Sequence, residues 1–180
     1  GNNPQETRMS GGGLVFTSLE AAKTDGLKIV VIDPRYSESA SLLADEWIAP
    51  RPGTDAALVA GIVHHLLAND LHDQAFLDQY CVGFDEDHMP PGIPAGNSYR
   101  SYIEGSGPDK VEKTPDWAAA ITGVPADVIR RFALDLGRTK PVNISQGWGP
   151  QRHANGENQA RAIYTLANVL GQVGIPGGGT

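Results

Sequence analysis

Four loops of this sequence carry residue types that bind polar or phosphorylated ligands. They are Gly1-Asn2-Asn3-Pro4, Asp33-Pro34-Arg35, the stretch RPGTD at 51–55 and the stretch QGWGPQR at 146–152. Gly and Asn form tight turns whose backbone N–H groups bind anions where a loop enters a helix. Because ligands of a parallel sheet lie beyond the carboxyl ends of its strands, we expect these loops to meet there. Each loop taken alone is equally an ordinary turn.

Two aspartates in these loops have the chemistry to bind a nucleotide. Asp33 ends a predicted strand and can accept hydrogen bonds from ribose hydroxyls, although its distance from Gly1 exceeds the ~20 residues of the dinucleotide fingerprint. Asp55 has two acceptor oxygens at the spacing of the N1–H and N2–H₂ donors of guanine. The alternatives stay open: Asp33 can form a turn before Pro34, and Asp55 can cap the following helix.

Trp148 and Arg152 lie four residues apart in a loop that contains glycines. Together they can place an aromatic wall and a fixed cation beside a small polar substrate. The alternative is a packed tryptophan and a solvated arginine.

The sequence predicts no metal site. His64 and His65 are adjacent and point apart on a helix, and His72 and His88 fall in no ligand spacing. The acidic run DED at 85–87 lacks the spaced oxygens and the glycine of a calcium loop. Surface or half-buried histidines are therefore expected.

The composition is that of a soluble globular domain. Of 180 residues, 40% are hydrophobic and 19% are charged, and the formal net charge is -7. A nucleic-acid partner is not expected, because the phosphate backbone attracts a basic face. Cys81 is the single cysteine, so the chain contains no internal disulfide and no self-contained iron–sulfur cluster, which takes four thiolates. No apolar stretch approaches the ~20 residues that span a bilayer.

The elements that must position these loops alternate along the chain. Strands are predicted at Lys28–Asp33, Glu46–Ala49 and Pro141–Ser145. Helices are predicted at Leu14–Lys23, Asp55–Asn69, Phe76–Tyr80, from Pro115 onward, Pro125–Leu136 and Gly156–Leu170. This alternation indicates an α/β fold of the Rossmann-like type: a doubly wound, mainly parallel sheet with helices on both faces.

Residues 1–180 are expected to form one domain. Segment 84–113 is rich in Pro, Gly and acidic residues and is predicted to be a surface excursion, with one possible ordered patch at Tyr99–Ile103. A loop such as GNNP normally follows a strand. We therefore expect the first strand of the domain to lie outside this sequence, in a longer chain.

Six stretches, taken together and in order, resemble one family. GNNPQETRMSGGG, VIDPRYSESA, RPGTDAAL, YCVGFD, QGWGPQRHANGE and GQVGIPGGG are similar to the catalytic subunits of bacterial dimethyl sulfoxide reductases and their selenate-reductase paralogues. These belong to the dimethyl sulfoxide reductase family of molybdenum oxidoreductases. Each stretch is a weak signal by itself, but six in register over essentially the whole chain are specific.

The resemblance implies a molybdenum cofactor with two molybdopterin guanine dinucleotides, one of which this domain binds. The residues implied to contact it are Gly1, Asn2, Asn3, Pro4 and Thr7 at the diphosphate and pterin side, Asp33, Pro34 and Arg35 at the guanosine sugar, Gly53, Thr54 and Asp55 at the guanine, and Gly147, Trp148, Gln151 and Arg152 at the pterins and the substrate funnel. Trp148 and Arg152 are the residues implied to act in catalysis. No residue of the chain is implied to ligate molybdenum, so the chain alone should be inactive.

The resemblance also implies an anaerobic respiratory enzyme that reduces S-oxides or N-oxides. Its partners would be an iron–sulfur electron-transfer subunit and a membrane anchor subunit, on the periplasmic side of the inner membrane. A [4Fe-4S] cluster would lie outside this chain. Three alternatives stay open: a selenate or other oxyanion reductase of the same family, a nicotinamide-dependent dehydrogenase domain, and a non-catalytic flavodoxin-like module. The first loop has no GxGxxG motif, which the dehydrogenase would use.

Overall fold

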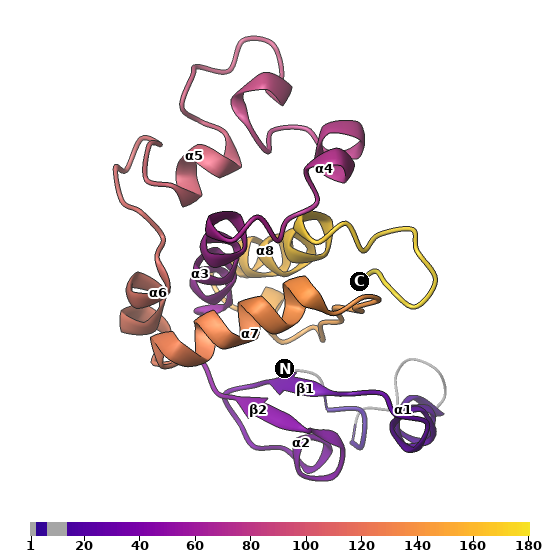
Figure 1. Ribbon diagram of the computed structural model, residues 1–180. Helices are drawn as coiled ribbons and strands as arrows, with labels where there is room; N and C mark the ends of the chain where they lie inside the picture. Colours follow the sequence, from indigo (N-terminus) through magenta and orange to yellow (C-terminus); the bar gives the residue numbers. More distant parts are fainter. Residues whose placement is uncertain (1–2, 7–13) are drawn as a thin grey trace.

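The structure, a computed structural model, describes residues 3–6 and 14–180 (Figure 1). Its strands are β1 (Val30–Ile32) and β2 (Glu46–Ile48). Its helices are α1 (Leu14–Thr24), α2 (Glu38–Leu43), α3 (Asp55–Ala68), α4 (Gln74–Tyr80), α5 (Tyr99–Ile103), α6 (Pro115–Thr122), α7 (Ala126–Arg138) and α8 (Gly156–Val169), with short 3-10 helices η2 (Glu86–His88) and η3 (Pro150–Arg152). None of the described helices is long and apolar enough to cross a membrane.

β1 and β2 pair in parallel, with Val30 opposite Glu46 and Ile32 opposite Ile48. A parallel pair needs a crossover connection, and α2 lies in it. The side chain of Ser37 caps α2 by accepting a hydrogen bond from the helix backbone. α2 was not predicted from the sequence, because six residues are too few to show a helical period.

The prediction of a strand at Pro141–Ser145 is wrong. Only Asn143 of this segment forms a bridge, with Gly179, among the described residues. Pro141 has no N–H to donate, and the N–H of Val142 donates to the side chain of Gln172 at 2.8 Å instead of to a strand. One backbone bond, from Ile144 N to Gly179 O, therefore takes the place of a ladder.

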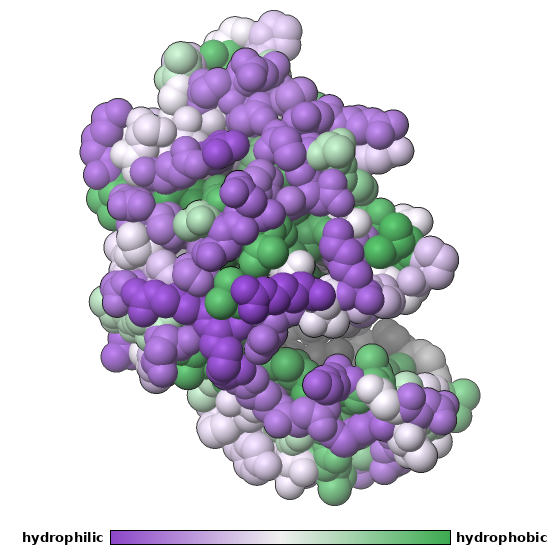
Figure 2. Space-filling view, viewed as in Figure 1, coloured by the Kyte–Doolittle hydropathy of each residue, from purple (hydrophilic) through white to green (hydrophobic). Residues whose placement is uncertain are grey.

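The fold is a helix-rich α/β arrangement with a small parallel sheet. The parallel pairing of the first two predicted strands is confirmed, whereas the described residues do not form a doubly wound sheet with helices on both faces. Instead α3, α6, α7 and α8 pack on one another beside the part that contains β1 and β2 (Figure 1). On the face drawn in Figure 2, a hollow separates these two parts at one side.

The core is built around α3, whose buried residues lie on more than one side of the helix. This helix packs against α6, α7 and α8. At Gly61 the approach is so close that an added Cβ would lie 2.5 Å from Cβ of Ala118 in α6. Thr114 caps α6 by accepting a hydrogen bond from Trp117 N at 3.1 Å, and Pro115 occupies its first turn.

Segment 84–113, predicted as a surface excursion, is attached to the core near both ends. Phe84 and Ile103 are buried in the core cluster. Lys113 is also buried; its ammonium pairs with Asp109 at 2.7 Å and lies 4.2 Å from the ring centre of Tyr102. The segment therefore contributes core side chains that its composition did not reveal.

A single carboxylate organises the middle of this segment. Glu86 accepts hydrogen bonds from Ser98 N at 3.1 Å, Gly96 N at 2.9 Å and Ser101 Oγ at 2.8 Å. The pKa of Glu86 is lowered to about 2, chiefly by its interaction with the Ser98 side chain and then by the bonds from Gly96 N and Ser101 Oγ. Glu86 thus stays ionised and links η2 to α5.

Candidate functional site

A pocket of about 180 Å³ lies where three of the four predicted loops meet. The end of β1, the loop into α3 and the turn at η3 supply its walls. Its lining residues are Asp33, Pro34, Pro50, Arg51, Pro52, Gly53, Asp55, Gly149, Pro150 and His153. The pocket is thus formed at the carboxyl ends of β1 and β2, as expected for a parallel sheet.

Asp33 is held rigidly at the end of β1. It is 8% exposed, and its backbone N–H donates to Ile48 O at 3.1 Å, which extends the pairing with β2. The N–H of Arg35 donates to Asp33 Oδ1 at 2.9 Å, and Trp47 Nε1 donates to Asp33 O at 2.8 Å. Asp33 therefore both forms the predicted turn before Pro34 and lines the pocket.

Asp55 is the first residue of α3 and faces the pocket. The helix-cap alternative is wrong, because Thr54 occupies the N-cap position. Within the described part of the chain, the Asp55 carboxylate accepts no hydrogen bond. Thr54 does not cap with its side chain either; its hydroxyl donates to Arg51 O at 2.7 Å. Instead, the side chain of Gln159 in α8 caps the N-terminus of α3: its Oε1 accepts a hydrogen bond from Ala56 N at 2.6 Å. Both acceptor oxygens of Asp55 are thus available to a ligand.

Arg51 is a pocket residue that the sequence analysis did not single out. Its guanidinium Nη1 donates to the carbonyl oxygens of Ala120 and Ile121, each at 3.0 Å, and its backbone N–H donates to Thr122 O at 2.7 Å. These carbonyls belong to the last turn of α6, where a helix offers no backbone N–H donors to its carbonyl oxygens. Arg51 therefore fixes the loop into α3 on the end of α6.

Replacing Arg51 with lysine should cost about 1 kcal/mol of folding stability, because one ammonium cannot reproduce both side-chain bonds. The melting temperature should fall by about 2–4 °C in a domain of this size. Arg161→Lys on α8 is the matched control, since the described residues offer Arg161 no side-chain partner. Equal melting of the two variants would show that Arg51 does not stabilise the end of α6.

The backbone of the turn at η3 packs closely against Gly156 at the start of α8. Pro150 is buried, and an added Cβ at Gly156 would lie 2.5 Å from Pro150 O and from the carbonyl carbon of Gln151. Asn155, just before, has a φ of 57° in the left-handed region. Only glycine at 156 lets α8 begin directly against the turn that carries Pro150 to the pocket.

Gly156→Ala should destabilise the protein by about 1–3 kcal/mol through overpacking and displace η3 from the pocket, lowering nucleotide affinity. Gly61→Ala is its matched control, because the added Cβ meets Ala118 Cβ at the same 2.5 Å but between α3 and α6. The measurements are thermal melting and nucleotide titration below both transitions. If Gly156→Ala keeps its affinity, η3 does not shape the binding pocket.

Trp148 and Arg152 lie together but outside the pocket wall. The guanidinium of Arg152 is 5.4 Å from the ring centre of Trp148, which is 52% exposed. Gly147 is half-buried and Gln151 is exposed in the same loop. The two side chains therefore form an exposed cation–π pair, with Arg152 at the end of η3; their role as an aromatic wall and a cation beside a substrate stays a prediction.

The first loop is fastened to the start of α2. Asn3 Oδ1 accepts from Ser39 Oγ at 2.5 Å, and Asn3 Nδ2 donates to Glu38 Oε2 at 3.2 Å. Pro4 is buried. The Asn3 amide thus positions the loop, whereas Gly1, Asn2 and Thr7 lie outside the described residues.

Arg35 and Glu38 form an exposed ion pair at 3.0 Å, and Glu6 lies 3.8 Å from the same guanidinium nitrogen. A hydrogen bond from its own backbone, followed by the bond from Asn3, lowers the pKa of Glu38. Arg35 does not line the pocket. Its guanidinium instead contacts Glu6 of the first loop and Glu38 of α2.

The lining chemistry fits the nucleotide end of a molybdopterin nucleotide. Carboxylates of Asp33 and Asp55 supply hydrogen-bond acceptors, and four proline rings supply flat apolar walls. The volume of about 180 Å³ is below the roughly 300–1,000 Å³ of pockets for whole drug-sized ligands. The pocket therefore suits a base and its sugar rather than a complete dinucleotide. His153 adds an imidazole that the sequence analysis missed, although it directly follows the predicted QGWGPQR loop.

Comparison with known proteins finds close relatives. The chain is 55% identical over 178 residues to dimethyl sulfoxide reductase DmsA of Escherichia coli (strain K12), a match that covers 99% of this chain and 22% of that protein. It is 37% identical over 164 residues to the dimethyl sulfoxide/trimethylamine N-oxide reductase of Rhodobacter capsulatus, covering 91% of this chain and 18% of the relative. The chain thus spans about a fifth of the length of the curated relatives it matches.

The fold and the family agree with these relatives. Acetylene hydratase from Pelobacter acetylenicus has a similar structure, with a TM-score of 0.68 and 30% identity over 87% of this chain and 19% of that one. The family described as molybdopterin oxidoreductase matches residues 1–180. This family implies a molybdenum–pterin cofactor. With its whole length matched, the chain belongs to the molybdopterin oxidoreductase family.

Proposed function

We propose that this chain binds one of two molybdopterin guanine dinucleotides in a molybdenum enzyme that reduces S-oxides or N-oxides. The observation that carries the proposal is the meeting of Asp33 and Asp55 in one pocket with an open carboxylate at the start of α3. The substrate class is supported by relatives named for dimethyl sulfoxide and trimethylamine N-oxide. No observation favours selenate or another oxyanion.

Asp55 would accept the N1–H and N2–H₂ donors of guanine, and Asp33 would accept from the ribose. Gly53 has a φ of 74°, and an added Cβ there would meet nothing within 4 Å, so the turn before α3 leaves room beside the base. The first loop, with Asn3 held on α2, would face the diphosphate, and Arg35 would lie at the guanosine sugar.

The bound molybdenum centre would supply the two-electron chemistry that removes oxygen from the substrate. The residues of this chain hold and orient the cofactor from its nucleotide end. Trp148 and Arg152 would present an aromatic face and a cation to a polar S-oxide or N-oxide beside the pterins. We place them at the substrate because they are exposed, because they contact each other, and because neither lines the nucleotide pocket.

The remainder of the longer protein would complete this assembly. We propose that further strands extend the sheet beside β1, where Val30 is 38% exposed, into the doubly wound arrangement. A [4Fe-4S] cluster, an iron–sulfur subunit, a membrane anchor and a periplasmic location belong to the same proposal. The nicotinamide-dependent alternative is not supported, since the chain matches a molybdopterin family over its whole length.

The proposal is tested by the nucleotide that the intact protein carries. Mild acid hydrolysis of the purified protein should release GMP at about two equivalents per molybdenum, with both quantities measured on one sample. Release of CMP, or of AMP from a nicotinamide cofactor, would contradict the guanine assignment.

A further inference from the structure

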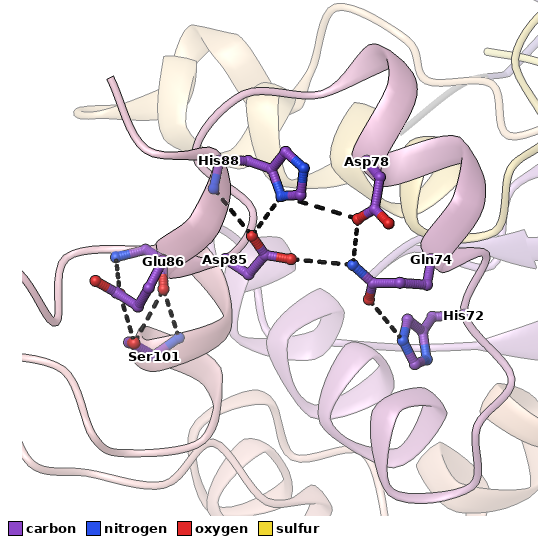
Figure 3. Close-up of polar contacts among 8 residues, drawn as sticks. His72, Gln74, Asp78, Asp85, Glu86, His88 and Ser101 are labelled. Carbon is purple, nitrogen blue, oxygen red and sulfur yellow. Dashed lines mark hydrogen bonds and ion pairs between the residues drawn. The ribbon is translucent and has the colours of Figure 1, made fainter. Parts of the chain in front are cut away.

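Three side chains with metal-binding atoms converge at one place away from the nucleotide pocket (Figure 3). They are Asp78 of α4, Asp85 just before η2, and His88 at the end of η2. One ligand atom from each lies within 4.8 Å of the others. His88 Nδ1 is 2.6 Å from Asp85 Oδ1 and 3.8 Å from Asp78 Oδ1. Their spacing along the sequence matches no ligand motif, so only the fold brings them together.

Gln74 orients the two carboxylates. Its Nε2 donates to Asp78 Oδ1 at 2.6 Å and to Asp85 Oδ2 at 3.0 Å, as Figure 3 shows. Ionised carboxylates only accept hydrogen bonds, so the amide nitrogen must face them and Oε1 must face His72. His72 Nε2, 3.1 Å from that oxygen, is therefore the donor. The Gln74 amide, itself held by the His72 imidazole, thus orients the two carboxylates in the way that hydrogen-bond partners of metal ligands do.

The two carboxylates lack a permanent positive partner. In the part of the chain that the structure describes, no lysine or arginine pairs with Asp78 or Asp85. Glu86 and Asp87 follow directly and add negative charge. The side chain of Asp85 is only 17% exposed, so water screens it incompletely. Among the described residues, the imidazole of His88 is the ion-pair partner of both carboxylates, and it carries a positive charge only when both ring nitrogens are protonated.

We propose that Asp78, Asp85 and His88 bind a divalent first-row transition-metal ion of the zinc type. One imidazole nitrogen and two carboxylate oxygens form the mixed N/O set that such ions take, with a position left for water because Asp78 is 45% exposed. Ca²⁺ requires six to eight oxygens, so the set disfavours it. On binding, His88 Nδ1 releases its proton to solvent and donates its lone pair to the ion.

The geometry needs only a small adjustment. Ligand bonds of about 2.0–2.2 Å in a tetrahedral arrangement place ligand atoms about 3.3 Å apart. The closer nitrogen–oxygen pair must open from 2.6 Å and the wider one must close from 3.8 Å. The ion would then tie α4 to η2, at the point where segment 84–113 leaves the helical body (Figure 1).

The test is zinc stoichiometry of the intact protein after removal of adventitious metal and equilibrium dialysis against micromolar ZnCl₂. We expect Asp85→Asn and His88→Gln to bind one zinc fewer per chain than the unaltered protein. His64→Gln is the matched control, because His64 also pairs with a carboxylate, Glu112 at 2.7 Å, but without a third ligand. This control should keep the full stoichiometry.

Asp78→Asn guards against loss of structure, since its exposed side chain can be changed with least disturbance. It should bind zinc at least tenfold more weakly while melting like the unaltered protein in the absence of zinc. Zinc, but not Ca²⁺ at the same concentration, should raise the melting temperature of the unaltered protein more than that of Asp78→Asn. Equal stoichiometry and equal zinc-dependent shifts in all variants would overturn the proposal, as would equal stabilisation by Ca²⁺.

Discussion

Asp55→Asn is expected to weaken GDP binding by about 5- to 150-fold while the circular dichroism spectrum stays native. The substitution replaces one acceptor oxygen by an NH₂ group, which then faces a donor of the guanine. An unpaired buried donor costs about 1–3 kcal/mol, which sets this range. Folding should hardly change, because within the described residues the Asp55 carboxylate has no hydrogen-bond partner to lose. The measurement is calorimetric titration of cofactor-free protein with GDP.

Asp127→Asn is the matched control for this experiment. Asp127 lies in the first turn of α7 and does not line the pocket, so its substitution removes the same charge from a helix start elsewhere. GDP affinity should be unchanged in this variant. If Asp55→Asn also binds GDP as tightly as the unaltered protein, Asp55 does not read the base.

Trp148→Ala and Arg152→Ala should each lower turnover of the intact enzyme by on the order of tenfold to a hundredfold, with molybdenum content nearly unchanged. The Arg152 guanidinium lies 5.4 Å from the ring centre of Trp148, so removing either side chain removes a contact that positions the other. Loss of substrate positioning alone can reduce rates a hundredfold. Turnover of an S-oxide is measured beside molybdenum per protein in the same preparation.

Arg161→Ala is the control. Arg161 is also an exposed arginine, it lies on α8 after this loop, and its side chain has no partner among the described residues. It should retain normal turnover. Parallel loss of molybdenum and activity in the Trp148 and Arg152 variants would instead place both residues in the support of the cofactor.

The helices with clear local signals were predicted well from the sequence. The predicted Asp55–Asn69 differs from α3 by one residue, and Pro115 begins α6 as expected. These elements have a helical apolar period or a cap followed by proline, and both signals act within one turn. The β1 strand was also predicted, because its β-branched run ends just before Pro34, and the alternation of strands and helices predicted its parallel pairing with β2.

The extent of the sheet could not be predicted. A doubly wound sheet needs strand partners, and partner strands are a property of the tertiary fold. At Pro141–Ser145 the composition favours a strand, but the Val142 N–H finds the Gln172 side chain instead of a neighbouring strand. This contact spans thirty residues and leaves no trace in the local pattern.

The meeting of Asp33 and Asp55 in one pocket was predicted in outline, whereas the contacts that support the pocket were not. Asp33 and Asp55 were placed correctly at strand and helix ends, because parallel topology brings such ends together. The anchoring of Arg51 on α6 depends on residues seventy positions away. The same holds for the cluster of Asp78, Asp85 and His88, whose members approach only through the turn between α4 and η2. Long-range contacts of this kind have no periodic signature.

We propose that the pocket between β1, α3 and η3 selects a guanine nucleotide. This selectivity can be measured by calorimetric titration of the cofactor-free protein with GDP and, separately, with NAD. We expect one GDP to bind per chain and NAD to bind at least about tenfold more weakly, since an adenine lacks the paired donors that Asp55 would accept. Equal affinity for the two nucleotides, or a preference for NAD, would contradict the claim.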